Sequence, residues 1–264
     1  MVRLLFNLLG RKYRTSFDGK KVVILAPHPD DEAFGCGGLI ARLCRQANYP
    51  HVIILSGGEC SLNGVANAPD KELLMQMRAK LTTAVSKLLG LPQDNIHRMY
   101  YPDGQLLEAL KEENDNELCR LLDELQVEIL LVPHRKDALS DHVSAYHIGR
   151  RYCNNHPQTK LYAYCVWVWY LHAWGLICEL FRSILYFMTT EEYAKKQAAI
   201  EAYTTPLAPC GEPWSGALPP SFLRIHKWKL EVYVRVEAPR SSARYSCILN
   251  VLYSKYKAVF TWKR

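Results

Sequence analysis

The sequence predicts an α/β fold, a Rossmann-like parallel sheet flanked by helices on both faces, with additional strands near the C-terminus. Three observations predict it. Four short apolar runs alternate with four segments of helical spacing in the first half of the chain. The apolar runs are rich in β-branched and aliphatic residues, as buried parallel strands are. The chain has 264 residues, 49% of them hydrophobic, enough to bury one large core.

The elements follow in a regular order. We expect strands over residues 21–26, 51–55, 96–100 and 127–132. The first helix has apolar positions at helical spacing, Leu39, Ile40, Leu43 and Cys44. The second covers residues 71–89 and is closed by Gly90 and Pro92. A third lies around residues 105–125, and a fourth begins near His142.

The pattern changes in the second half. Residues 160–190 form an aromatic segment, for which we expect a strand over 163–168 and then an amphipathic helix through Phe187 that lies over the domain or dips into a membrane face. A transmembrane helix is disfavoured because the segment is aromatic rather than aliphatic. Residues 206–220 read as a loop, and 222–236 with 245–260 as two or three strands. Residues 1–20 are an N-terminal extension of a single domain, 1–264.

Charge and cysteine content limit the class of protein. Lys and Arg exceed Asp and Glu by 33 − 26 = +7, which suits phosphates, anionic sugars or a membrane face and does not argue for nucleic acid. Nine scattered cysteines without CxxC pairs indicate reduced thiols, hence a cytoplasmic protein. Peripheral membrane contact stays open. We also expect a homo-oligomer, with the number of subunits open.

The strongest chemical signal lies where the first strand ends, at Pro27-His28-Pro29-Asp30-Asp31-Glu32. Ligands of open parallel sheets collect at the carboxyl ends of strands. A histidine and three carboxylates in five positions call for a compensating cation, and imidazole with carboxylate suits zinc. His28 and Asp31 offer two ligands, and the pair Asp141-His142 after the fourth strand offers the third.

Structural roles are the alternatives to metal binding for the residues of this motif. A helix cap explains one aspartate of the motif but not the whole cluster. For Glu32 we prefer a supporting hydrogen bond to direct ligation, and for Asp141 an orienting role. Asp103 reads as a turn residue near the site. Trp167, Trp169 and Trp174 fit a core, a sugar pocket or a lipid contact equally well.

The stretch APHPDDEAFGCGGLIARL resembles the signature of the LmbE-like (PIG-L) family of zinc-dependent N-deacetylases. Further elements follow in the family's order: SGGE at 56–59, Arg78, PDG at 102–104, SDH at 140–142 and VWVW at 166–169. The resemblance implies that His28, Asp31 and His142 bind Zn²⁺, that Asp30 is the general base, and that Arg78 binds substrate. The identity of the metal stays open, since another divalent ion could take the place of zinc.

The chain departs from this pattern at Leu139. The family commonly has a histidine there, two residues before the aspartate of the DH pair. This histidine is credited with stabilising the oxyanion or protonating the amine. His134, His147 and His172 are candidates to replace it. Asp30 could also return its proton to the leaving amine.

The resemblance implies a metal-dependent hydrolase that removes acetyl from an N-acetylated amino sugar, such as an N-acetylglucosamine derivative, or its conjugate. Two alternatives stay open: a metallohydrolase acting on another bond, such as a phosphoester, and a membrane-associated or sugar-binding member with weakened or altered activity.

Overall fold

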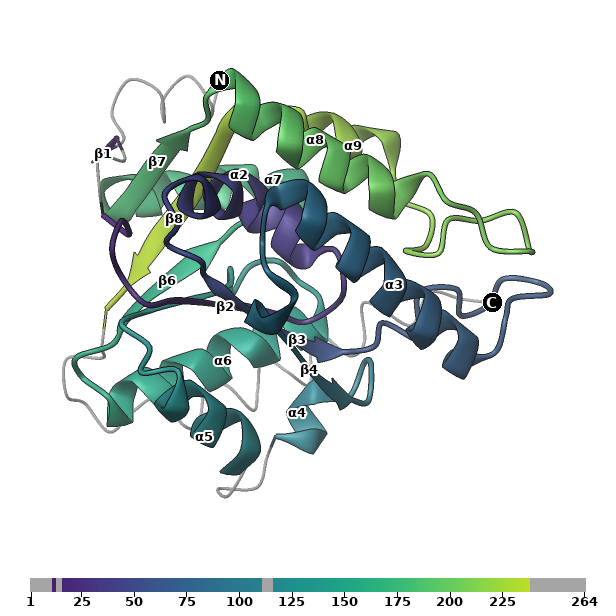
Figure 1. The fold of residues 1–264 in the computed structure, drawn as a ribbon, viewed down its shortest axis with the longest axis horizontal. Coiled ribbons are helices and arrows are strands. Elements are labelled where there is room, and N and C mark those ends of the chain that lie inside the picture. Colours follow the sequence, from purple (N-terminus) through teal and green to yellow (C-terminus); the bar gives the residue numbers. More distant parts are fainter. Residues whose placement is uncertain (1–10, 13–15, 111–115, 238–264) are drawn as a thin grey trace.

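One mixed sheet organises the chain, and a computed structural model describes residues 11–12, 16–110 and 116–237 (Figure 1). The strand order is β1-β7-β8-β6-β5-β2-β3-β4. The strands are β1 (Arg11–Lys12), β2 (Val22–Ala26), β3 (His51–Ser56), β4 (Ile96–Tyr101), β5 (Ile129–Pro133), β6 (Lys160–Tyr164), β7 (Ser183–Phe187) and β8 (Leu230–Val236). All neighbours pair in parallel except β8, which runs antiparallel to β6 and β7 and lies between them.

Helices cover both faces of this sheet, as the sequence predicts. They are α2 (Asp31–Arg45), α3 (Lys71–Leu89), α4 (Leu106–Ala109), α5 (Asn116–Glu124), α6 (Ser140–Asn155), α7 (Val168–Leu171), α8 (Thr190–Thr204) and α9 (Pro220–His226), with 3₁₀ helices η1 (Gln93–Asn95) and η2 (Ala173–Arg182). The third predicted helix is divided into α4 and α5.

Alternation along the strands divides the core in two. Val22 and Ile24 of β2 pack in one cluster with α2, α3 and α8. Val23 and Leu25 pack in the other, with α4, α5 and α6. Successive strand residues point to opposite faces, so one buried strand supplies both clusters. The carboxyl end of β2 is thereby held between two layers of helices.

Two expectations for the second half are wrong. No amphipathic helix runs through Phe187, because α7 ends at Leu171 and η2 leads into strand β7, in which every residue except Phe187 is buried. Residues 222–236 are not all strand, since Pro220 begins helix α9 and buries Phe222 and His226, spaced one helical turn apart. The strand expected over 245–260 lies outside the described residues.

Within the described ranges, no helix has the length and apolar content needed to cross a membrane. The expected cytoplasmic location, homo-oligomeric state and single domain over 1–264 stay predictions.

Gly35 gives a prediction for the packing of α2 on the sheet. A Cβ at Gly35 would lie 2.2 Å from Cδ2 of Tyr164, which is buried and donates a hydrogen bond to the Leu25 carbonyl at 2.7 Å. We expect Gly35→Ala to lower the free energy of unfolding by about 1–3 kcal/mol, because overpacking outweighs the gain in helix propensity. Urea denaturation measures the change.

Gly37→Ala on the same helix is the control. Its added Cβ would lie 3.1 Å from Cγ of Lys196, a milder approach than the one at Gly35. We expect a smaller loss there, and an equal loss in both variants would contradict the packing argument.

Candidate metal centre and active site

A strained turn carries the His-Pro-Asp-Asp-Glu motif from β2 into α2. Asp30 has φ 125°, a backbone conformation that residues with a side chain rarely adopt. Polar contacts hold it there: the Asp30 N–H donates to Glu32 Oε2 at 3.0 Å, and Arg78 donates to the Pro29 carbonyl and to Asp30 Oδ2, the latter at 3.0 Å. The turn therefore aims two neighbouring carboxylates, Asp30 and Asp31, in fixed directions at the end of the strand.

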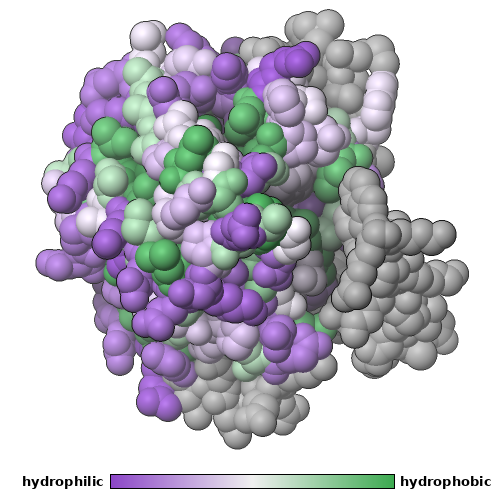
Figure 2. Space-filling view, turned by 90° about the vertical axis from the view of Figure 1, so that its right-hand side faces the viewer, coloured by the Kyte–Doolittle hydropathy of each residue, from purple (hydrophilic) through white to green (hydrophobic). Residues whose placement is uncertain are grey.

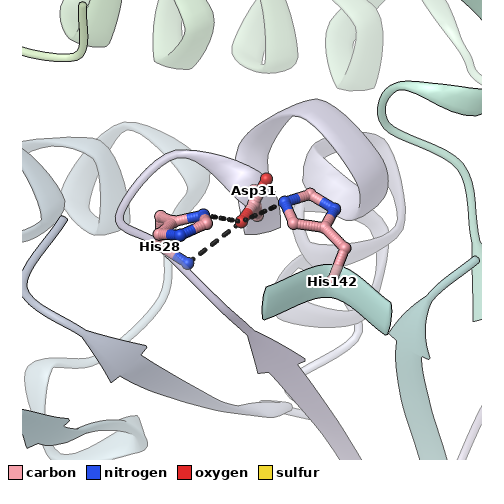
Figure 3. Close-up of side chains that lie close together, drawn as sticks. All are labelled: His28, Asp31 and His142. Carbon is pink, nitrogen blue, oxygen red and sulfur yellow. Dashed lines mark hydrogen bonds and ion pairs between the residues drawn. The ribbon is translucent and has the colours of Figure 1, made fainter. Parts of the chain in front are cut away.

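The structure brings His28, Asp31 and His142 together from two distant parts of the chain. Asp31 Oδ2 lies 3.2 Å from His28 Nδ1 and 3.2 Å from His142 Nε2 (Figure 3). His142 comes from the first turn of α6, just after β5, which lies beside β2 in the sheet. Adjacent parallel strands thus deliver both imidazoles to one edge, as expected for the carboxyl ends of an α/β sheet.

The donor set fits a divalent cation. His142 is fully buried, and its Nε2 has no hydrogen-bond partner within the described part of the chain, although Asp31 Oδ2 lies 3.2 Å away. Its other nitrogen, Nδ1, lies 3.0 Å from Asp137 Oδ2. His28 likewise has a carboxylate on its second nitrogen, with Asp103 Oδ1 3.1 Å from Nε2. Metal-binding histidines are commonly oriented by such carboxylates.

The pKa values show how strongly these groups attract positive charge. Burial lowers the pKa of His142, but the carboxylates of Asp31 and Asp137 outweigh it and raise that pKa to about 9. Burial raises the pKa of Asp31, but His142 and His28 outweigh it and hold that pKa well below its usual range. A divalent cation would supply the positive charge that protons otherwise bring to this cluster.

Asp30 sits beside the cluster with a different environment. It lies in the cavity wall, and burial raises its pKa to about 8 even though the neighbouring Arg78 opposes this shift. Such a carboxylate accepts a proton near neutral pH. Asp30 and Asp31, adjacent in sequence, therefore have pKa values shifted in opposite directions, as acid–base and ligand roles require.

Arg78 is buried and bound to the protein itself. Besides its bonds to Pro29 and Asp30, Arg78 donates a hydrogen bond to the Gly58 carbonyl at 3.0 Å. A Cβ at Gly58 would lie 2.5 Å from the Arg78 guanidinium, so the glycine leaves room for this side chain. Arg78 also lines the cavity. Through these contacts Arg78 holds Asp30 in place. Direct contact of Arg78 with substrate stays a prediction.

Glu32 and Asp141 both accept hydrogen bonds close to the motif, and their supporting roles stay predictions. Glu32 accepts hydrogen bonds from the Tyr203 hydroxyl at 2.6 Å and from the Asp30 N–H. Asp141 accepts from the Gly104 N–H at 2.7 Å and lies 3.4 Å from His28 Nε2. Both therefore brace the strand-end loops.

A cavity of about 360 Å³ opens over this cluster. Its polar lining includes His28, Asp30, Asp103 and Ser140. Its apolar lining includes Trp167 and Phe222, whose ring centroids lie 4.2 Å apart. Figure 2 shows the molecule from the right-hand side of Figure 1, the side toward which β3 and β4 point. Hydrophobic and hydrophilic residues lie intermixed on this face. The site thus offers a polar floor with aromatic rings beside it.

Leu139 lines the cavity where the family commonly has histidine. The described lining includes none of the candidate replacements, His134, His147 and His172. His134 is buried, with Nε2 3.1 Å from Glu179 Oε2, and His172 is exposed. His28 is the only imidazole of the described lining, so no histidine replaces the missing one there.

Asp137 is the site residue that sequence reasoning missed. It is fully buried, and besides contacting His142 it accepts the N–H groups of Val166 at 3.3 Å and Val168 at 2.7 Å. The available signal was a carboxylate in the strand-to-helix loop just before His142. Asp103, which reads as a turn residue, also orients His28.

We expect Asp137→Asn to weaken zinc binding about 10- to 100-fold. An amide offers one carbonyl oxygen and cannot accept from His142, Val166 and Val168 as two carboxylate oxygens do. Competition with a chromophoric chelator measures the affinity. Asp123→Asn is the matched control, since that exposed side chain pairs with Tyr152 and His156. Equal affinities in the two variants would contradict the orienting role.

Comparison with known proteins identifies the family to which this domain belongs. Residues 23–153 match the family model described as GlcNAc-PI de-N-acetylase, PIG-L. The chain carries a PIG-L family domain. A curated relative of this domain is the uncharacterized deacetylase YaiS of Escherichia coli (strain K12), 23% identical over 145 residues, which cover 53% of this chain and 71% of YaiS.

Solved structures share the fold of the PIG-L domain. The N,N'-diacetylchitobiose deacetylase from Pyrococcus horikoshii is 19% identical, with a TM-score of 0.55 and 76% of each chain covered. The zinc-inhibited form of teicoplanin deacetylase Orf2 is 12% identical, with a TM-score of 0.60, over 84% of this chain and all of that one. GalB, a 4-carboxy-2-hydroxymuconate hydratase, has a TM-score of 0.52 at 17% identity over 84% of this chain and 98% of its own. The fold is therefore shared by deacetylases and by at least one hydratase.

Proposed function

We propose that this PIG-L domain is a zinc-dependent N-deacetylase that removes acetyl from an N-acetylated amino sugar or its conjugate. The observation that carries the proposal is the convergence of His28, Asp31 and His142, with the Asp31 oxygen 3.2 Å from both rings at the floor of a cavity. These three side chains would hold the cation.

The residues around that position divide the remaining work. When bound, a divalent cation makes water a nucleophile near neutral pH and polarises the amide carbonyl. Asp30, next to a ligand and held by Arg78, would take a proton from the water as its oxygen attacks the amide carbon. Asp30 would then give that proton to the amine nitrogen as the C–N bond breaks. Water and amide thus become acetate and a free amine.

The shape of the cavity favours a sugar. Trp167 and Phe222 offer ring faces, while Ser61, Ser140 and Asp103 offer hydrogen-bonding groups along the same cavity. A pyranose has an apolar face and a rim of hydroxyls, and such a mixed lining suits both. A volume of about 360 Å³ is sufficient for a small sugar ligand.

Acetate release tests the proposal. The purified protein would be incubated with a panel of N-acetylated sugars and conjugates, and acetate and free amine would be measured together. We expect one equivalent of each, loss of activity after chelation and return of activity with added zinc. A phosphoester substrate serves as the second arm, and metal-dependent phosphate release without acetate release would contradict the proposal.

Leu139 favours a second candidate, a sugar-binding member of the family with weakened turnover. Calorimetric binding of an N-acetyl sugar to the zinc-loaded protein, with no acetate released over many hours, would support this candidate. Acetate release at an ordinary enzymatic rate, with kcat of about 1 s⁻¹ or more, would exclude it.

A further inference from the structure

Apolar side chains are exposed beside the cavity. Tyr170 is 40% exposed, Leu171 39% and Trp174 61%. We call these three residues the aromatic rim. Tyr170 and Leu171 end α7, and Trp174 is the second residue of η2. Large exposed apolar side chains close together in one segment indicate an interaction surface more strongly than isolated ones do.

The aromatic rim is joined directly to the wall of the cavity. The ring centroid of Tyr170 lies 6.3 Å from that of Trp167 and 6.4 Å from that of Phe222, and both of these residues line the cavity. Phe222 belongs to α9, which packs against α7. Whatever covers the aromatic rim therefore lies close to the candidate active site.

The same region is strongly basic. Residues 166–182 and 213–230 contain Arg182, Arg224, Lys227 and Lys229, all exposed, and a single carboxylate, Glu179. Glu179 is buried and already surrounded by positive groups, with Arg135 Nη2 3.4 Å and Lys136 Nζ 3.2 Å from Oε1. Two of these cations, Arg224 of α9 and Lys227 just after it, lie beside the segment that carries the aromatic rim, because α9 packs against α7.

These observations favour one occupant. Tyr and Trp are suited to the boundary between lipid headgroups and acyl chains, and exposed Lys and Arg are attracted to anionic lipids. A second copy of the chain placed symmetrically on this surface would bring the same positive charges against it. We propose that the aromatic rim, with Arg224 and Lys227 on α9, docks on an anionic lipid bilayer. The proposal does not depend on the deacetylase function, and its test requires no turnover.

Vesicle co-sedimentation tests the docking. The full chain would be mixed with vesicles of phosphatidylcholine alone or of phosphatidylcholine with phosphatidylglycerol, at low and high salt. We expect binding to the anionic vesicles only, weakened by salt. Each removed cation should weaken binding about 5-fold, so Arg224→Gln with Lys227→Gln should weaken it about 30-fold. Trp174→Ala should also weaken it.

Matched controls lie near the amino ends of β6 and β3, away from the carboxyl ends that carry the candidate site. Lys160→Gln removes an exposed cation at the start of β6, and Tyr49→Ala removes an exposed aromatic just before β3. We expect both to bind vesicles as the wild type does, and thermal unfolding shows that every variant is folded.

Three results would overturn the proposal. The first is equal binding to neutral and anionic vesicles, and the second is unchanged binding of the rim and α9 variants, which would assign membrane contact to another part of the chain. The third is concentration-dependent self-association, seen by light scattering, that Trp174→Ala abolishes while vesicle binding is absent.

Discussion

Asp30→Asn is expected to lower kcat for acetate release by about 10²-fold or more while leaving zinc bound. The amide has nearly the same shape and keeps one oxygen for Arg78, but it cannot accept a proton from water or return one to the amine. Binding of zinc should persist because His28, Asp31 and His142 are unchanged. Steady-state kinetics on the zinc-loaded variant, with metal content measured on the same sample, check both statements.

Asp94→Asn is the control for this variant. Asp94 lies in η1, outside the described cavity lining, so its change should leave kcat as it is. Wild-type turnover by Asp30→Asn would show that another group is the base, and loss of zinc would show that Asp30 supports the metal site rather than the proton transfer.

His142→Ala is expected to abolish stoichiometric zinc binding and with it all measurable acetate release. The substitution removes the one fully buried imidazole of the cluster and leaves the Asp137 carboxylate, also fully buried, without its imidazole partner. A catalytic zinc site commonly has three protein ligands, and two are insufficient here to compete with water and buffer. Elemental analysis after gel filtration gives the metal content per chain.

His147→Ala is the matched control on the same helix. Its imidazole lies five residues further along α6 and is not part of the described cavity lining, so zinc content and activity should be retained. One zinc per chain in His142→Ala would place the cation elsewhere. Loss of zinc in both variants would indicate damage to α6 rather than loss of a ligand.

The sequence was most informative where local pattern and tertiary role coincide. The runs that become β2, β3 and β5 are apolar because both faces of each strand are buried, so their pattern alone locates them. The clustering of charge in the motif from His28 to Glu32 located the site for a similar reason. Such a cluster at a strand end would be unstable without a compensating partner.

Prediction failed where distant contacts decide the structure. The segment that becomes β7 is apolar enough for a helix, and its pairing with β1 and with β8, over forty residues later in the chain, fixes it as a strand. Arg78 has the spacing of an ordinary helical residue, and its burial depends on carbonyl groups of two separate loops. Asp137 has only a weak sequence signal, its place just before His142, because its three partners come from α6 and from the chain after β6.

The place of β8 in the sheet has a consequence for biosynthesis. Because β6 and β7 each pair with this late strand, both keep an open edge on the ribosome until Leu230–Val236 has been synthesised. The nascent protein therefore completes its sheet only after Val236 has been synthesised, and a chain released earlier would expose two unpaired β edges to aggregation.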